Sequence, residues 1–243
     1  MITIGLLYPG YSAEDDFAVA ETIISNAITG LRLPLVHTAM ASDAHRPEEL
    51  RAWGRASVLA EGAAELQPED PDALMWACTS GSFVFGWDGA RQQADDLAAR
   101  CGRPASSTSL AFAHAVSALG LRRIAVAASY PDDVARMFVH FLSEAGTEVI
   151  NFGVSDIVYA SDVGKLGRDQ VISMVQAADL PAADGILVPD TAMHTLSIID
   201  DLDQAIGKPV LTANQVTVWE GLRLLGELQP LPGLGRLFAT SPA

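Results

Sequence analysis

The residue with the clearest chemical potential is a cysteine that ends an apolar segment and precedes a run of hydroxyl side chains. Cys78 follows the apolar segment 73–77 and comes before Thr79–Ser82. A thiol at a strand end, next to the start of a helix, lies near exposed backbone amides that lower its pKa and favour the thiolate. Thr79 and Ser80 would donate hydrogen bonds to a carboxylate and to an enediolate formed from it. The alternatives are that Cys78 is a small buried residue and that the hydroxyls cap a helix.

A second set of polar candidates follows strands in the other half of the chain. Asp190 and Thr191 come after an apolar run, and an aspartate that faces Cys78 across an apolar cleft would favour its protonated form and donate a proton. Tyr130 ends another strand, where its phenol would donate to a substrate oxygen. Asn214 precedes the final helix and would line the cleft. The alternatives are helix N-caps for Asp190 and Asn214, and packing for Tyr130.

These candidates occupy matched places because the second half of the chain repeats the plan of the first. The matched pairs are Ile4–Pro9 with Ile124–Pro131, Asp72–Ser82 with Asp184–His194, and Gly102–Pro104 with Gly207–Pro209. A duplicated chain of this period predicts two similar lobes rather than a solenoid. Cys78 and Asp190 are then expected to meet in the cleft between the lobes, and Pro9 and Ser12 to lie at the same edge.

Short apolar runs alternate with longer amphipathic segments along the whole chain. We expect strands at 3–8, 33–40, 73–77, 124–128, 148–152, 186–188 and 210–212, and helices at 18–29, 47–66, 92–100, 110–119, 132–145, 168–177, 196–206 and 215–225. This alternation predicts an α/β fold with two pseudo-symmetric lobes, each a parallel sheet flanked by helices, and an active site in the inter-lobe cleft.

The boundary between the lobes is expected near Gly120, which gives a first α/β lobe at 1–120 and a second at 121–243. The last helix of either lobe is expected to cross and pack on the other, so that the C-terminal segment packs on the first lobe. The tail after Gly226 is rich in proline and glycine and predicts an extended strap, with Leu237 and Phe238 as its anchor.

Composition narrows the class of partner. The chain has 243 residues, 49% of them apolar, and a net charge of −15, which disfavours binding to nucleic acid or to an anionic membrane surface. No stretch resembles a secretory signal or a membrane span, so we expect a cytoplasmic protein with reduced cysteines and no membrane partner. A small-molecule carboxylate is the expected ligand, held by backbone amides and hydroxyls because the lysines and arginines do not cluster. The sequence leaves a homo-oligomer open.

The spacing of His, Cys and carboxylate residues matches no metal site, so we expect no metal. The glycine-rich pieces lack the Gly-x-Gly-x-x-Gly order, and no lysine-containing phosphate loop occurs, so we expect no nicotinamide, flavin or ATP cofactor.

Five segments together resemble the aspartate/glutamate racemase superfamily, with the closest likeness to maleate cis-trans isomerases and arylmalonate decarboxylases. They are IGLLYPG near the start, ACTSGSF around Cys78, YPDDV from Tyr130, GKPVLTANQVTVWEGLRLLG from Gly207, and GLGRLF near the end. The resemblance covers nearly the whole chain. It implies a pseudo-symmetric two-lobe fold and cofactor-free chemistry next to a carboxylate, through one or two cysteines.

The resemblance also implies roles for single residues. Cys78 matches the nucleophilic first-lobe cysteine of maleate isomerases, where the decarboxylases have glycine. Thr79, Ser80 and Tyr130 match the carboxylate pocket of the decarboxylases, and Asn214 falls in an Asn-Gln segment of the isomerases. The chain departs from both subfamilies at position 190, where aspartate replaces the second-lobe cysteine. It also has serine at position 12, where maleate isomerases tend to have asparagine.

Three functions follow as hypotheses. The leading one is a cofactor-independent isomerase of the maleate isomerase type, in which Cys78 acts as a thiolate and Asp190 moves the proton. The second is an arylmalonate-type decarboxylase in which Cys78 protonates the enediolate. The third is a catalytically inactive carboxylate-binding protein.

Overall fold

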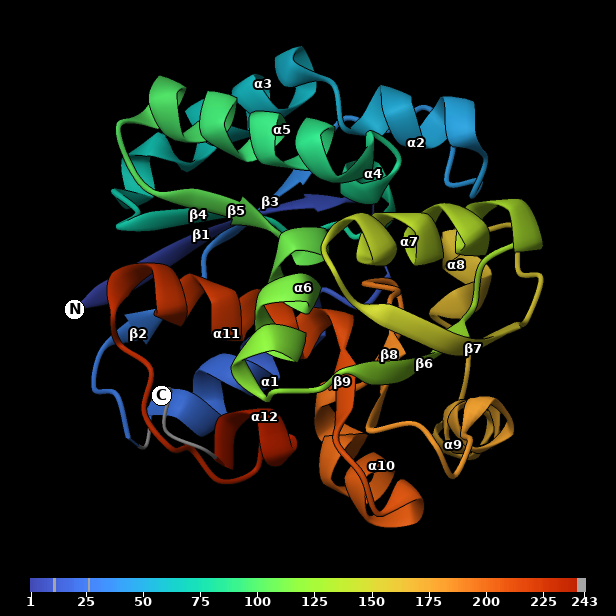
Figure 1. The fold of residues 1–243 in the computed structure, drawn as a ribbon. Helices are drawn as coiled ribbons and strands as arrows, with labels where there is room; N and C mark the ends of the chain where they lie inside the picture. Colours follow the sequence, from blue (N-terminus) through green and yellow to red (C-terminus); the bar gives the residue numbers. More distant parts are fainter. Residues whose placement is uncertain (11, 26, 240–243) are drawn as a thin grey trace.

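The computed structural model describes residues 1–10, 12–25 and 27–239 and contains two parallel sheets (Figure 1). The strands are β1 (Ile2–Pro9), β2 (Leu31–Arg32), β3 (Leu35–Thr38), β4 (Ala73–Trp76), β5 (Ala105–Ser107), β6 (Arg123–Ala128), β7 (Glu148–Val154), β8 (Gly185–Val188) and β9 (Val210–Thr212). In the first sheet the order is β2-β1-β4-β5, with β3 also paired to β1, and in the second it is β7-β6-β8-β9. The predicted α/β class with two parallel sheets is confirmed.

Helices separate almost all the strands. They are α1 (Asp15–Ser25), α2 (Pro47–Trp53), α3 (Ala56–Leu66), α4 (Ser80–Phe83), α5 (Gly86–Cys101), α6 (Thr108–Ala118), α7 (Asp132–Glu144), α8 (Ala160–Val163), α9 (Arg168–Ala178), α10 (Ile199–Ile206), α11 (Ala213–Leu225) and α12 (Gly235–Ala239), with 3-10 turns η1 (Gln67–Glu69) and η2 (Leu196–Ile198). Among the described residues, none of these helices has the length and apolar character to cross a membrane.

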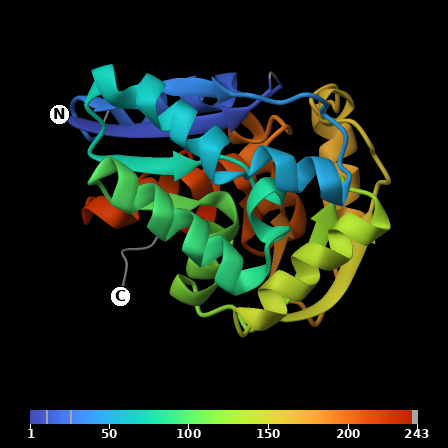
Figure 2. The same cartoon turned by 90° about the horizontal axis from the view of Figure 1, so that it is seen from above.

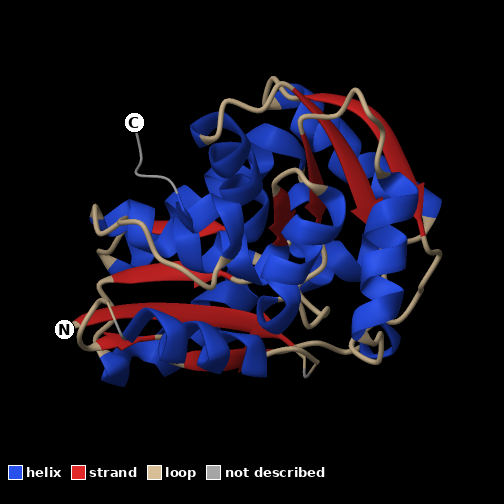
Figure 3. Ribbon diagram, turned by 90° about the horizontal axis from the view of Figure 1, so that it is seen from below, coloured by secondary structure: helices blue, strands red, loops and turns tan. Residues whose placement is uncertain are grey.

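The central strands are short and apolar because helices cover both of their faces. Every residue of β4 and of β8 is buried, as expected for parallel strands between two helical layers. Figure 3 shows the strands of both sheets lying between helices. Helices α3 and α5 lie on one side of the first sheet and α11 lies on the other (Figure 1).

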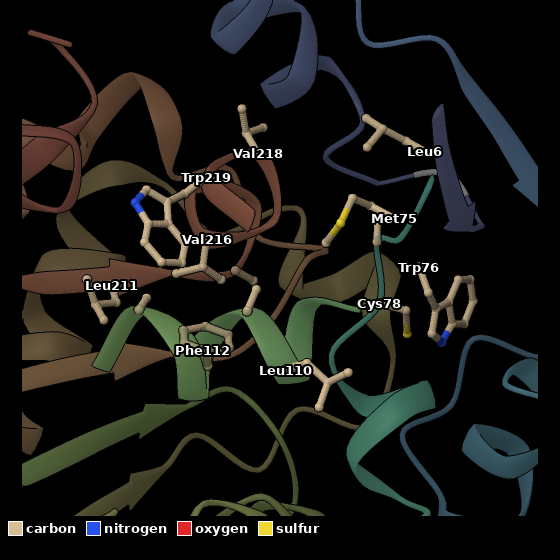
Figure 4. Close-up of a cluster of buried hydrophobic side chains, with 14 of the residues drawn as sticks. Leu6, Met75, Trp76, Cys78, Leu110, Phe112, Leu211, Val216, Val218 and Trp219 are labelled. Atoms are coloured by element: carbon tan, nitrogen blue, oxygen red, sulfur yellow. The ribbon is translucent and has the colours of Figure 1, made fainter. Parts of the chain in front are cut away.

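The two halves of the chain are interleaved through their helices. Helix α11 follows β9 of the second sheet but packs on β4 and β5 of the first, as predicted for the last helix. A Cβ atom on Gly221 of α11 would lie 2.8 Å from Cγ2 of Ile4, so the glycine allows this close approach. Helix α6 packs against α11, and the hydroxyls of Thr108 and Thr217 are 2.6 Å apart. Figure 4 shows Phe112 of α6 and Val216 of α11 in one buried cluster.

A second contact between the halves adjoins the first, since the rings of Phe112 in α6 and Phe138 in α7 are 5.5 Å apart. Seen from above, α7 lies beside α4 and α5 (Figure 2). The rings of Phe83 and Phe138 are 5.3 Å apart, and those of Trp87 and Phe141 are 5.4 Å apart. The first sheet ends at Ser107 and the second begins at Arg123, with α6 between them. The lobe boundary at Gly120 stays a prediction.

Three predicted elements differ in the structure. The helix expected at 47–66 is two helices that divide at Gly54, where a Cβ atom would lie 2.1 Å from the carbonyl oxygen of Gly81. The strand expected at 33–40 is shorter and begins only after Pro34, which has no backbone N–H to donate. The C-terminal strap ends in the short helix α12 rather than in an extended segment, although its expected anchors Leu237 and Phe238 are buried.

Candidate active site

A cavity of about 40 Å³ lies where the carboxyl ends of strands from both sheets meet. Residues that follow β1, β4 and β8 line it, in the place where ligands bind in parallel α/β folds. Of the residues expected from the sequence, the cavity wall contains Pro9, Ser12, Cys78, Ser80, Asp190 and Thr191. This volume suits one or a few water molecules, so the segments around the cavity must move apart to admit an organic acid.

Cys78 is buried two residues after the end of β4 and lines this cavity. The backbone N–H of Gly81 donates to Sγ over 3.2 Å, and the Ser80 hydroxyl oxygen lies 3.9 Å from it. Burial nevertheless raises the pKa of the Cys78 thiol to about 12, because desolvation outweighs these contacts and the nearby Asp190 adds to it. The predicted lowering of this pKa is therefore wrong. Helix α4, which begins at Ser80, has only four residues and supplies little dipole.

Asp190 lies on the side of the cavity formed by the second sheet. The hydroxyl of Ser129 donates to its Oδ2 atom, and the backbone N–H of Ala192 donates to Oδ1 over 3.0 Å. The side chain is almost fully buried. It does not cap the following helical turn, whose N-cap residue is Thr195. The expected meeting of Asp190 with Cys78 at one cavity is thus present.

His45 also lines the cavity, and the sequence analysis did not select it. Its Nε2 atom lies 3.9 Å from Oδ2 of Asp190, and its Nδ1 atom lies 3.3 Å from the carbonyl oxygen of Ile157. The imidazole is 2% exposed and packs edge-on against Tyr130, with ring centroids 4.8 Å apart. A single histidine in an Ala-His-Arg-Pro loop carries no motif, so no sequence signal marked it.

The loop that carries His45 also closes the cavity against the second half of the chain. The backbone N–H of His45 donates to the carbonyl of Val158 over 2.6 Å, and that of Ala160 donates to the carbonyl of Asp43 over 2.9 Å. The Asp43 carboxylate accepts from the backbone N–H of Ser161 over 3.1 Å. We name this set of contacts between residues 43–45 and 158–161 the loop clasp.

Three expected site residues lie behind the cavity wall rather than on it. The Tyr130 phenol donates to the carbonyl of Pro189, and burial raises its pKa well above the usual range. The Thr79 hydroxyl is buried and makes no hydrogen bond of acceptable geometry with any described residue. Asn214 donates to Asp16 over 3.0 Å and to the carbonyl of Thr191 over 3.2 Å. Contact of these three with substrate stays a prediction.

Tyr8 is a second residue of the wall that sequence reasoning did not select as a site residue. Its phenol donates to the carbonyl of Thr191 over 2.9 Å and accepts from the backbone N–H of Ala13 over 3.1 Å. Tyr8 ends β1, so this bond joins the first sheet to the loop after β8. Tyr8 and Asn214 together fix the position of Thr191.

The charge of the wall limits how it can hold an anion. Among the described residues that line the cavity there is no lysine or arginine, and the acidic side chains are Asp43 and Asp190. A carboxylate ligand would therefore meet hydroxyls, backbone N–H groups and the imidazole of His45. No group of three or more His, Cys, Asp or Glu side chains in the described part of the chain is arranged to hold a metal ion.

A family model, relatives by sequence and solved structures all match this chain. Residues 55–238 match the arylmalonate decarboxylase family. Arylmalonate decarboxylase of Bordetella bronchiseptica is 30% identical over 216 residues, which cover 86% of this chain and 88% of the relative. Maleate isomerase of Nocardia farcinica is 23% identical over 186 residues, which cover 74% of each chain.

Solved structures agree with this fold. One is a liganded arylmalonate decarboxylase variant in which a glycine is replaced by cysteine and a cysteine by serine. It is 25% identical, has a TM-score of 0.86, and is matched over 99% of this chain and 100% of that one. A cysteine-to-alanine variant of the maleate isomerase of Pseudomonas putida S16, solved with maleate, is 20% identical with a TM-score of 0.89 over 99% and 98% of the two chains. The relatives are enzymes, as the sequence resemblance predicted, and this chain belongs to the arylmalonate decarboxylase family.

Proposed function

We propose that the protein is a cofactor-independent decarboxylase of a small α-substituted malonate, with the Cys78 thiol as the proton donor. The observation that carries this proposal is the state of the thiol. Cys78 is buried at the cavity, and its raised pKa of about 12 keeps it protonated. Protonation of an enediolate needs a neutral thiol, whereas nucleophilic addition needs a thiolate.

The proposed reaction uses groups that line or adjoin the cavity. The bond between the α-carbon and one carboxyl group breaks, carbon dioxide leaves, and the electron pair forms an enediolate with the remaining carboxylate. The S–H bond of Cys78 then breaks and its proton forms the new C–H bond. We expect the Ser80 hydroxyl, which is on the cavity wall, to donate to the enediolate oxygens, which hold more negative charge than the starting carboxylate. The Thr79 hydroxyl lies behind the wall and would join it only when the segments around the cavity move apart.

Isomerisation of a cis dicarboxylate is the second candidate, and it was the leading hypothesis from the sequence. The N–H of Gly81, 3.2 Å from Sγ, would stabilise a thiolate that adds to the double bond. A maleate isomerase of Nocardia farcinica has been solved with a covalently bound succinylcysteine. This reaction requires that substrate binding remove the thiol proton, so we place it second. The matched relatives are enzymes, and we do not favour an inactive binding protein.

The test uses 2-methyl-2-phenylmalonate and maleate as substrates. We expect carbon dioxide and 2-phenylpropionate from the malonate, and loss of this activity by at least 100-fold in Cys78→Ala. The matched control is Cys101→Ala, which removes a half-buried thiol at the end of α5, outside the cavity wall. Conversion of maleate to fumarate without carbon dioxide release would establish the second candidate instead. Retention of either activity in Cys78→Ala would refute the role of the thiol.

Three further expectations remain part of this proposal. They are a cytoplasmic location, lobes at 1–120 and 121–243, and a small carboxylate as the partner, with a homo-oligomer left open. Analytical ultracentrifugation would determine the number of chains in the particle.

A further inference from the structure

His45 and Asp190 form an acid–base pair that the proposed role of Cys78 does not use. Imidazole gives and takes protons near neutral pH more readily than any other side chain. In this chain it is buried on the wall of the cavity that Cys78 also lines. Its chemical role depends on which ring nitrogen faces the cavity and on whether that nitrogen carries a proton.

The contacts of the ring determine its tautomer. The carbonyl oxygen of Ile157, 3.3 Å from Nδ1, can only accept a hydrogen bond, so Nδ1 carries a proton. Nε2 is then the atom that exchanges a proton, and it lies 3.9 Å from Oδ2 of Asp190. Such distances shorten when a ligand fills a site.

The ring is held in this orientation from several sides. Its centroid lies 4.8 Å from that of Tyr130 and 6.2 Å from that of Trp53, both in edge-on geometry. The backbone N–H of the same residue is bound to Val158 in the loop clasp. Because packing and the backbone already fix the side chain, little conformational entropy is lost when Nε2 is brought into position against a ligand.

Asp190 is better placed to assist His45 than to donate a proton itself. Its Oδ1 atom accepts from the backbone N–H of Ala192, and its Oδ2 atom accepts from the Ser129 hydroxyl. Both carboxyl oxygens of Asp190 therefore accept hydrogen bonds from the protein, and Oδ2 also lies 3.9 Å from Nε2 of His45. The arrangement orients and supports an imidazole as a carboxylate does in other acid–base sites.

Cys78 and His45 both follow strands of the first sheet, β4 and β3. The Nε2 atom of His45 nevertheless lies beside the second sheet, 3.9 Å from Oδ2 of Asp190, which follows β8. A carboxylic acid bound between the thiol and this Nε2 atom would present one face of its α-carbon to the thiol and the other to the imidazole.

We infer that His45, supported by Asp190, is a second acid–base residue of this site and exchanges a proton with the α-carbon on the face opposite Cys78. The inference rests on the proposed function because both need a stabilised enediolate. In the exchange, the C–H bond breaks, its electron pair enters the enediolate, and Nε2 takes the proton. The S–H bond of Cys78 then breaks, and its proton forms a C–H bond on the other face, which inverts the configuration of the α-carbon. Proton exchange with solvent returns His45 and Cys78 to their starting forms.

The experiment follows each enantiomer of 2-phenylpropionate in D₂O. Proton NMR measures loss of the α-proton, and chiral chromatography measures inversion. The native protein is expected to exchange and invert both enantiomers. His45→Gln is expected to lower the inversion rate of both enantiomers at least 100-fold. Asp190→Asn, which keeps the imidazole, is expected to lower the inversion rate by about 10- to 100-fold.

His140→Gln is the matched control, because His140 is an exposed residue of α7 that pairs with Glu144 outside the cavity wall. Its inversion rate should equal that of the native protein, and circular dichroism of each variant establishes that it is folded. Undiminished inversion in a folded His45→Gln or Asp190→Asn variant would overturn the inference, as would absence of inversion by the native protein. Carbon dioxide release from 2-methyl-2-phenylmalonate is measured separately, so failure of the decarboxylase proposal is distinguishable from failure of this one.

Discussion

The protonation state of Cys78 gives a prediction that can be tested without knowing the substrate. Burial raises the pKa of this thiol from 9.0 to about 12. Three units correspond to a 1000-fold lower thiolate fraction at any pH well below both values. Alkylation rates follow the thiolate, so at pH 8 iodoacetamide should modify Cys78 at least about 1000-fold more slowly than an unfolded cysteine. A Cys101→Ser background leaves one thiol to measure.

The assay is mass spectrometry of the alkylated protein from pH 7 to 11, with a urea-unfolded sample as the reference. The rate in the folded protein should still be rising at pH 11, whereas the unfolded sample should level off above its ordinary value of 9.0. A folded-state rate that levels off below pH 9 would refute the argument from burial. Such a result would also move isomerisation ahead of decarboxylation.

Further predictions concern stability. The unfolding free energy should fall as pH rises from 9.0 toward 12, by up to about 4 kcal/mol, because only the unfolded state ionises Cys78 there, and Cys78→Ala should lack this component in pH-dependent denaturation. The Glu220 carboxylate accepts from Arg223 and His114, which lower its pKa against the opposing effect of burial, so its stabilising contribution is present above pH 4.5 and is lost as pH falls. Glu220→Gln should therefore cost about 1–3 kcal/mol at pH 7 and much less near pH 3, and an equal cost at both would contradict this. Gly221→Ala should cost about 1–3 kcal/mol in urea denaturation because its new methyl group would meet Ile4, and a neutral effect would show that α11 can shift away from the first sheet.

The sequence predicted the frame of the fold because central parallel strands have a distinctive composition. Segments such as 74–76 and 186–188 are continuously apolar and fully buried, and turn residues separate them from amphipathic helices. Strand β5 was missed because Ala-Ser-Ser has no apolar signal, and it forms only by pairing with β4. The break after α2 falls at Gly54 and was missed because the helical pattern at 47–66 runs through this glycine, and an isolated glycine is tolerated within a helix.

Part of the site was predicted because the central strands could be located from their composition. Residues that directly follow strands, such as Cys78 and Asp190, could be placed at one cleft from strand order alone. The pKa of Cys78 could not, because it depends on how deeply the folded chain buries the thiol. His45 could not be selected because its partners, Ile157 and Asp190, lie more than one hundred residues further along the chain.

The position of α11 has a consequence for the chain as a folding unit. A fragment that stopped at residue 120 would keep β4 and β5 but lose the helix that covers one face of them, including its contact between Gly221 and Ile4. The complementary fragment would carry α11 with no sheet to bury its apolar side. Neither piece should persist alone in solution, and the two should regain a cooperative transition only when mixed. An ancestor that consisted of one such half would have needed to form a dimer, in which the helix of a second chain covered the apolar face of its sheet.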